Sequence, residues 1–310
     1  VLVAPGEPPL PGLESLPNGI ELTTVSAEVQ LREQLPQTDI LVVTDFRTGL
    51  LESCWPAQHS IKWVHATSAG VDALLFPALV ESDLVLTNAR GVFDLGIAEY
   101  VLGAVLLFAK DTLGNLRHQR AHQWQHRETD LISGKQALVI GAGSIGGEVA
   151  RVLSAMGLEV TGVARSARDT PHFKRVVANE DLQKYLPSAD YVVITAPLTP
   201  TTEGLINQRT LAQMKPEAVL INVGRGAVVV TDDLVEALQQ KVIAGAALDV
   251  FEPEPLPPNH PLWDMPNVMM SAHMSGDFVG WRQALGEQFK ANLERWLASE
   301  ALFNQVDKGK

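Results

Sequence analysis

The chain has 310 residues, more than one ordinary hydrophobic core accommodates, so we expect two domains. Hydrophobic residues make up 46% of the sequence and charged residues 19%, a composition that excludes a disordered chain. The formal net charge is -12 and no basic stripe is visible, which argues against nucleic acid or a membrane surface as a partner. An anionic substrate would therefore need a local positive pocket.

The single cysteine, Cys54, rules out an intrachain disulfide and agrees with a reducing cytoplasm. Between Ser53 and the bulky Trp55, it is expected to be a buried structural thiol and not a nucleophile. No charged and then apolar leader opens the sequence. The longest apolar run, residues 100–109, is shorter than the roughly 20 residues that span a bilayer. We expect a cytoplasmic protein.

The first part of the chain alternates short β-branched runs with longer stretches, the pattern of a parallel α/β sheet. A first strand is expected at residues 1–3. Further strands are expected at residues 40–43, 61–64 and 84–87. One long helix should follow, over residues 96–116.

A second alternating series then predicts a complete doubly wound dinucleotide-binding domain. Its six expected strands are residues 137–140, 160–163, 191–195, 219–223, 246–250 and 268–271. After Phe278 the apolar residues recur at helical spacing, at Leu285, Phe289, Leu293 and Trp296. We expect this tail helix to return to the first domain. That assigns residues 1–97 and 277–310 to a discontinuous substrate-binding domain, and 98–276 to the dinucleotide-binding domain.

A glycine-rich loop, GAGSIG at residues 141–146, follows an expected strand and opens an expected helix. In that context the GxGxxG pattern is a strong signal of dinucleotide binding. Gly141 permits a tight turn, Gly143 lets the backbone approach a pyrophosphate, and Gly146 allows the helix to pack closely on the strand. The amides of the helix N-terminus would face the phosphates.

The end of the next strand indicates which nicotinamide cofactor is bound. NAD-dependent proteins carry an acidic residue there for the ribose 2′-hydroxyl. This chain has Ala164 at that position, followed by Arg165, Ser166 and Arg168. Two arginines with no carboxylate suit a 2′-phosphate, so we expect NADPH to be preferred over NADH. The alternative is that these arginines belong only to a solvated loop.

Three histidines have a spacing similar to that of metal ligands. His118, His122 and His126 recur every four residues, which would place them on one helix face. The outer two would then be about 12 Å apart at a rise of 1.5 Å per residue, so one ion could not bind all three. Arginines surround them. We expect no metal here, but a solvated or interface surface.

The chain resembles the D-isomer-specific 2-hydroxyacid dehydrogenases, on the glyoxylate/hydroxypyruvate-reductase side. The motifs that carry the resemblance occur in the family's order over nearly the whole chain. They are TSAGVD at 67–72, the GxGxxG loop, PLTPTT at 197–202, NVGRG at 222–226, LDVFEPEP at 248–255 and SAH at 271–273. The resemblance implies two Rossmann-like, doubly wound parallel-sheet domains with the active site in the cleft between them. It also implies a homodimer.

The resemblance assigns the catalytic roles to Arg225, Glu254 and His273. His273 would donate the proton to the developing alkoxide, Glu254 would favour the charged imidazolium, and Arg225 would bind the substrate carboxylate and polarise the carbonyl. Considered singly, Glu254 could be a solvated turn residue and His273 a structural histidine. All three follow expected strands of one parallel sheet, however, at the edge where this architecture binds ligands.

The resemblance also implies the ligand contacts. Asp249 would lie near the nicotinamide. The cofactor-binding residues would be Gly141, Gly143, Ser144, Ile145, Gly146, Ala164, Arg165, Ser166, Arg168, Ala196, Pro197, Thr202, Val223, Gly224, Arg225, Asp249, His273 and Ser275. The substrate, a small 2-keto or 2-hydroxy acid, would contact Ser68, Ala69, Gly70, Arg225 and His273.

One departure concerns the residues after the histidine, MSGD at 274–277, where the family often has Ile and small residues. Ser275 could contact substrate or cofactor, which leaves the substrate's identity open. The alternative function is a non-catalytic nucleotide sensor on the same fold. A sensor of that kind would need interaction segments beyond the fold, and the sequence shows almost none.

Overall fold

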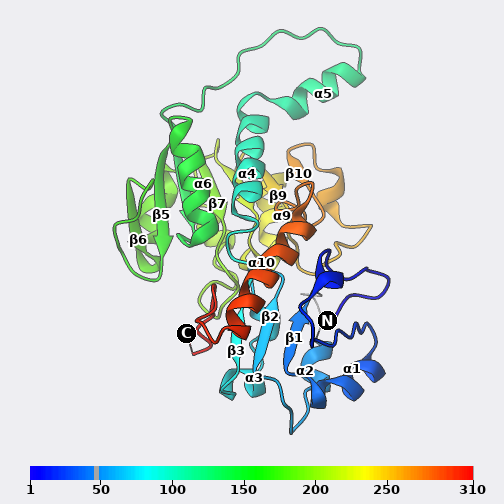
Figure 1. Ribbon diagram of the computed structural model, residues 1–310. Coiled ribbons are helices and arrows are strands. Elements are labelled where there is room, and N and C mark those ends of the chain that lie inside the picture. Colours follow the sequence, from blue (N-terminus) through cyan, green and yellow to red (C-terminus); the bar gives the residue numbers. More distant parts are fainter. Residues whose placement is uncertain (45–48, 310) are drawn as a thin grey trace. The chain divides into compact units, whose positions relative to one another are not determined.

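The computed structural model describes residues 1–44 and 49–309, and the chain forms two compact units (Figure 1). The first unit combines Val1–Phe93 with Phe278–Lys310, and the second is Asp94–Asp277. The two units therefore divide at 93/94 and 277/278, while the assignment of 1–97 and 277–310 to substrate binding and of 98–276 to dinucleotide binding stays a prediction.

The first unit contains a parallel sheet in the order β1-β2-β3, with β1 at Ile40–Val43, β2 at Trp63–Ala66 and β3 at Val85–Thr87. The strand expected at residues 1–3 is wrong in extent, because only Leu2 pairs, through isolated bridges to Val25 and Val43. Pro5, which has no N–H to donate, follows in a turn. The unit's short helices are α1 (Glu28–Gln34), α2 (Leu50–Cys54) and α3 (Pro77–Glu81), with 3-10 turns at Leu13–Ser15, Leu35–Gln37 and Asp72–Leu74.

The C-terminal helix α10, Trp281–Leu297, completes the core of this first unit. Phe289 stacks on Trp63 with ring centroids 5.4 Å apart, and Trp296 stacks on Trp63 at 5.6 Å. The chain then runs along β3, where Gln305 bridges Thr87. The ammonium of Lys308 donates to the carbonyls of Ser82 and Leu84 just after α3. Cys54 is buried in this unit, as expected.

The second unit contains a seven-stranded parallel sheet in the order β10-β9-β8-β7-β4-β5-β6. This is one strand more than expected, because β6 is a short run after a loop. The strand order reverses direction between β4 and β7, and the crevice at such a point binds nucleotides in this architecture. The strands are β4 (Gln136–Ile140), β5 (Glu159–Ala164), β6 (Arg175–Ala178), β7 (Tyr191–Ile194), β8 (Val219–Asn222), β9 (Gly245–Leu248) and β10 (Val268–Met270).

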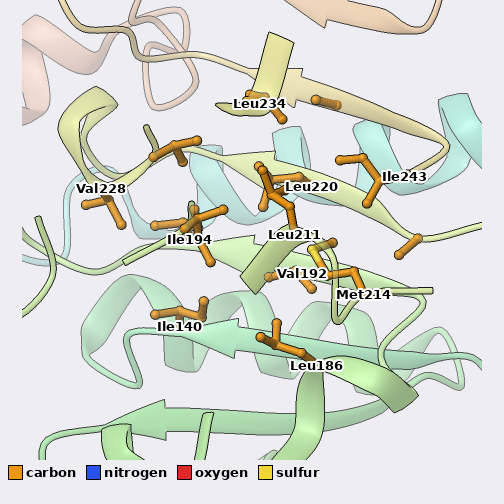
Figure 2. Packing of buried hydrophobic residues seen from close by; sticks show 14 of the residues in the cluster. Ile140, Leu186, Val192, Ile194, Leu211, Met214, Leu220, Val228, Leu234 and Ile243 are labelled. Atoms are coloured by element: carbon orange, nitrogen blue, oxygen red, sulfur yellow. The ribbon is translucent and has the colours of Figure 1, made fainter. Parts of the chain in front are cut away.

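One face of this sheet forms the largest apolar cluster, seen from close by in Figure 2. Ile140, Val192 and Leu220 come from three adjacent strands, and Leu186 and Leu234 pack over them. The helices of the unit are α6 (Ser144–Ala155), α7 (Leu182–Tyr185), α8 (Gln208–Leu211) and α9 (Thr231–Gln239), with 3-10 turns at Asn179–Asp181, Leu186–Ser188, Gly226–Val228 and Pro261–Asp264. Because the core fixes the strands, their carboxyl ends form a rigid edge for the loops.

The helix expected at residues 96–116 is instead two helices, α4 (Asp94–Ala109) and α5 (Thr112–Arg120). Asp111 separates them with a positive φ of 44°, and its side chain caps α5 by accepting from the amide of Gly114. A residue that caps a new helix cannot continue the previous one. Within the described residues, neither these helices nor any other is long and apolar enough to cross a membrane.

The expected single helix face of His118, His122 and His126 is also wrong. Helix α5 ends at Arg120, and His122 has a φ of 55°, outside the helical range. The ring of His118 instead lies 3.1 Å from the side-chain oxygen of Gln123. No group of three or more metal-binding side chains is found in the part of the chain that the structure describes.

Candidate active site

The glycine-rich loop connects β4 to α6 at the point where the strand order reverses. Gly141 has a φ of 108°, and a Cβ built on it would lie 2.6 Å from the amide nitrogen of Ala196. A Cβ on Gly146 would lie 1.8 Å from the carbonyl oxygen of Gly141. A Cβ on Gly143 would meet nothing within 4 Å, so space is open over the start of α6. The helix's first amides, at residues 144–146, have no intrahelical acceptor, so the loop fits a pyrophosphate group.

Two side chains outside the glycine pattern hold this loop in place. The hydroxyl of Thr195, just after β7, donates to the carbonyl of Gly141 over 2.7 Å. The hydroxyl of Ser144 donates to the carboxylate of Asp94, the first residue of α4. No motif in the sequence indicated Thr195 or Asp94. The only signal for them was a hydroxyl at a strand end and an acid at a helix start.

At the end of β5, Ala164 occupies the position where NAD-dependent proteins carry an acidic residue. Arg165, Ser166 and Arg168 are exposed in the following loop. The loop turns back toward the glycine-rich loop, because Arg168 Nη2 donates to the carbonyl of Ala142 over 2.8 Å. Arg168 therefore contacts the glycine-rich loop directly.

The turn after β7 is held by its own threonines. The hydroxyl of Thr202 is buried and donates to the carbonyl of Pro197 over 2.7 Å, while accepting from the amide of Thr199 over 2.8 Å. Thr202 therefore maintains the turn that presents Pro197 beside the buried Ala196. A direct contact of Thr202 with the cofactor stays a prediction.

The Arg225 loop follows β8 and is shaped by Asn222, a buried residue that the sequence analysis did not include in the site. Asn222 accepts from the amide of Gly224 over 3.1 Å and donates to the carbonyl of Arg225 over 3.0 Å. The guanidinium of Arg225 donates to the carbonyl of Gly224 over 2.9 Å. In the sequence, the only indication of this role is that Asn222, with its amide side chain, ends an otherwise aliphatic strand.

Glu254 and His273, both among the expected catalytic residues, contact each other directly. Glu254 lies in the loop after β9, and His273 in the turn after β10. His273 Nδ1 lies 2.9 Å from Glu254 Oε2, and the amide of Phe251 donates to the other carboxylate oxygen over 3.0 Å. Burial raises the pKa of Glu254, but the bonds from His273 and Phe251 outweigh it and hold that pKa below the ordinary 4.5. Glu254 is therefore an ionised partner for the imidazole.

The turn that carries His273 is built on Asp249. His273 has a φ of 53°, and its amide donates to the carbonyl of Asp249 over 2.8 Å. The amides of Met274 and Ser275 donate to the two carboxylate oxygens of Asp249, each over 2.9 Å. Asp249 is completely buried, so its carboxylate orients the histidine turn. Contacts of Asp249 and Ser275 with a cofactor stay predictions.

The expected substrate-binding segment lies in the first unit. Ser68 Oγ donates to the carbonyl of Gly70 over 2.6 Å, and Asn88 Nδ2 donates to the carbonyl of Ala69 over 2.7 Å. These bonds fix the turn after β2 and occupy its carbonyls. Binding of a substrate carboxylate by the amides of Ala69 and Gly70 stays a prediction.

Known proteins share both the sequence and the fold. Residues 102–275 match the model of "D-isomer specific 2-hydroxyacid dehydrogenase, NAD binding domain". A glyoxylate/hydroxypyruvate reductase A from Serratia proteamaculans is 32% identical over 293 residues, covering 87% of this chain and 90% of the relative. An NADPH-dependent glyoxylate/hydroxypyruvate reductase from Sinorhizobium meliloti, solved with NADP and sulfate, superposes with a TM-score of 0.82 at 28% identity, over 94% of this chain and 92% of that one.

A D-isomer specific 2-hydroxyacid dehydrogenase from Xanthobacter autotrophicus, solved with NADPH and MES, has a TM-score of 0.76 at 32% identity, over 88% of this chain and 84% of that one. The chain belongs to the D-isomer specific 2-hydroxyacid dehydrogenase family. It is an NAD(P)-dependent oxidoreductase, and the alternative of a non-catalytic sensor is not supported.

Proposed function

We propose that the protein reduces a small 2-keto acid to the D-2-hydroxy acid with NADPH, and that His273 is the proton donor. The observation that carries the proposal is the His273–Glu254 pair, 2.9 Å apart, with Arg225 on the loop of the next strand. All three follow the carboxyl ends of adjacent strands of one sheet, where this architecture binds its ligands. The reductases named above act on glyoxylate and hydroxypyruvate, which supports a small 2-keto acid as substrate.

The hydrogen bond to Glu254 fixes which imidazole nitrogen exchanges the proton. A carboxylate only accepts, so Nδ1 of His273 carries the hydrogen of that bond. Nε2 is then the atom that gives a proton to the developing alkoxide and recovers one afterwards. The guanidinium of Arg225 would bind the substrate carboxylate and stabilise the charge that grows on the carbonyl oxygen. The nicotinamide cofactor supplies the hydride.

The preference for NADPH is supported by the end of β5. Ala164 offers no carboxylate to a ribose 2′-hydroxyl, and Arg165 is exposed beside it. Arg168 is already drawn toward the glycine-rich loop by its bond to Ala142. Related structures were solved with NADPH or NADP, which agrees with this preference.

A homodimer is part of the proposal. Helix α5 and the segment after it extend away from the sheet of the second unit (Figure 1). This segment exposes Trp124 completely and Leu131 to 73%. Two large apolar side chains exposed on one projecting segment suit a protein contact. In sedimentation velocity, Trp124→Ser should weaken self-association, while the same change at the exposed Trp263 should not.

The catalytic proposal is tested with His273→Asn and a control that shares its backbone geometry. His172 is exposed and has a φ of 69°, so His172→Asn makes the same substitution at a similar backbone conformation. His273→Asn should lower kcat about 10²–10⁴-fold and leave NADPH binding intact. His172→Asn should match the wild type. Activity of His273→Asn within threefold of wild type would reject the assignment.

The substrate class is tested separately with a panel of glyoxylate, hydroxypyruvate, pyruvate and bulkier 2-keto acids, each with NADPH and NADH. Small 2-keto acids should give the highest kcat/KM, and chiral chromatography should show the D product. A ketone without the carboxylate should be a poor substrate, because Arg225 would have no anion to bind. An L product, or equal rates on such a ketone, would contradict the proposal.

A further inference from the structure

Helix α4 contacts the turn that carries His273 through a chain of hydroxyl groups. The hydroxyl of Tyr100, on α4, lies 2.6 Å from Ser271 Oγ. Ser271 Oγ in turn donates to Oδ1 of Asp249, the buried carboxylate that also accepts from the amides of Met274 and Ser275. This series of hydrogen bonds therefore connects Tyr100 to residues on both sides of His273 in the sequence.

The direction of these hydrogen bonds follows from the donors available. Ser271 has one hydroxyl hydrogen, and Asp249 can only accept it. Tyr100 must then be the donor to Ser271. Burial raises the pKa of Tyr100 to about 12, so the phenol keeps its proton at neutral pH. The order is Tyr100 to Ser271 to Asp249.

A second contact lies one helical turn away on the same face of α4. A Cβ built on Gly96 would lie 3.0 Å from the carbonyl oxygen of Gly276. Residues four apart share a helix face, so Gly96 and Tyr100 contact the two ends of one turn, at Gly276 and Ser271. The histidine between these ends has a positive φ, a conformation that persists only where its surroundings enforce it.

We propose that Tyr100 is a positioning residue for His273, acting through Ser271 and Asp249. Its hydroxyl fixes the rotamer of Ser271, which orients the Asp249 carboxylate that holds the turn. The proposal rests on the proposed role of His273 in proton transfer. It predicts that loss of one phenolic oxygen on α4 changes the environment of the His273 imidazole through Ser271 and Asp249.

The test is Tyr100→Phe, which removes the oxygen and keeps the ring, with Tyr191→Phe as matched control. Tyr191 is a buried tyrosine on β7 of the same unit, away from the histidine turn. Tyr100→Phe should lower kcat about three- to tenfold, the effect of one hydrogen bond. The KM for NADPH should change less than twofold. Tyr191→Phe should leave kcat unchanged.

A spectroscopic measurement separates this inference from the catalytic proposal. In the protein without substrate, the ring signals of His273 can be assigned by their loss in His273→Asn. Tyr100→Phe should shift or broaden those signals, and Tyr191→Phe should not. If His273→Asn stays active, the catalytic proposal fails whatever the spectra show. If His273→Asn is inactive but Tyr100→Phe matches Tyr191→Phe in kcat and spectrum, the positioning role is overturned.

Ser271→Ala tests the same link with a smaller change. If the hydroxyls act in series, adding Tyr100→Phe to Ser271→Ala should lower kcat by no more than a further twofold. Effects on kcat that multiply fully in the double variant would mean that Tyr100 acts by another route, and would overturn the proposed order.

Discussion

Gly226 packs on the backbone of Phe251 so closely that a Cβ built on Gly226 would lie 1.9 Å from the carbonyl oxygen of Phe251. Gly226 follows Arg225 directly, and the amide of Phe251 donates to Glu254. The contact therefore joins the loop of Arg225, the proposed substrate-binding arginine, to the loop of the carboxylate that pairs with His273. The relative position of Arg225 and Glu254, two groups of the proposed active site, depends on Gly226 having no side chain.

Gly226→Ala should separate these two loops. We expect a loss of stability of about 1–3 kcal/mol from the forced backbone shift. We also expect kcat/KM to fall roughly 100-fold, because catalysis is sensitive to displacements of about 1 Å. Gly103→Ala on α4 is the control, since a Cβ there meets nothing within 4 Å. Thermal unfolding and steady-state kinetics of both variants measure the two effects, and a fully active Gly226→Ala would disprove the coupling.

Glu254→Gln should lower kcat for reduction by about tenfold and move the alkaline limb of its pH profile to lower pH. The reason is that the imidazolium of His273 loses its anionic partner. In the wild type, the lowered pKa of Glu254 means that this carboxylate stabilises the fold above about pH 4.5, and that the contribution is lost as the pH falls further. The measurement is kcat across pH, and an unchanged profile would remove Glu254 from the site.

The two arginines after β5 should behave differently. Arg165→Ala should raise the KM for NADPH about 10- to 100-fold and leave the KM for NADH nearly unchanged, since a charge-assisted contact to the 2′-phosphate is lost. Arg168→Ala should raise the KM for both NADPH and NADH, because Arg168 also donates to the carbonyl of Ala142 in the glycine-rich loop. Kinetics with both cofactors distinguish the two roles. Equal kcat/KM for NADPH and NADH in the wild type would mean that the arginines form only a solvated loop.

His65 should make the first unit sensitive to acid. It is completely buried on β2, and burial lowers its pKa from 6.5 to about 4. The unfolded chain binds the proton first as pH falls, so stability is complete above about pH 6.5 and declines toward pH 4. Between pH 7 and pH 5 the loss should be about 2 kcal/mol.

Hydrogen exchange of the peptide covering β2, corrected for intrinsic rates, measures this loss locally. In His65→Leu the difference between pH 7 and pH 5 should nearly disappear. His172→Asn, which removes an exposed histidine, should keep the wild-type difference. A pH dependence of equal size in His65→Leu would assign the effect to another group.

Sequence patterns predicted the sheets well, because parallel strands buried on both faces are continuous apolar runs. Strands β7 and β8 each lie within one residue of the expected ends. The patterns missed β6, whose apolar run spans only Val176–Ala178 after a charged arginine. The patterns also predicted one helix where the structure has α4 and α5. The break between them depends on the side chain of Asp111, which caps the amide of Gly114, and not on a helix-breaking residue.

For the site, motif order placed Arg225, Glu254 and His273 on the correct strand ends. It could not identify the residues that hold them, since Asn222, Tyr100 and Ser271 act through hydrogen bonds to partners distant in sequence. Tyr100 and Ser271, for example, are separated by 171 residues. Pairings of this kind are created by the fold and leave no local periodicity.

The contribution of α10 to the first unit sets an order for folding during synthesis. Residues 94–277 form one continuous unit, whereas the first unit lacks Leu285, Phe289 and Leu293 until the chain's last helix is made. At about 5–20 residues per second, the ribosome needs roughly 10–40 s to pass from residue 94 to residue 281. During that time the faces of Trp63 and Val42 that α10 covers stay exposed. The nascent first unit should therefore depend on chaperones until Trp281–Leu297 has been synthesised.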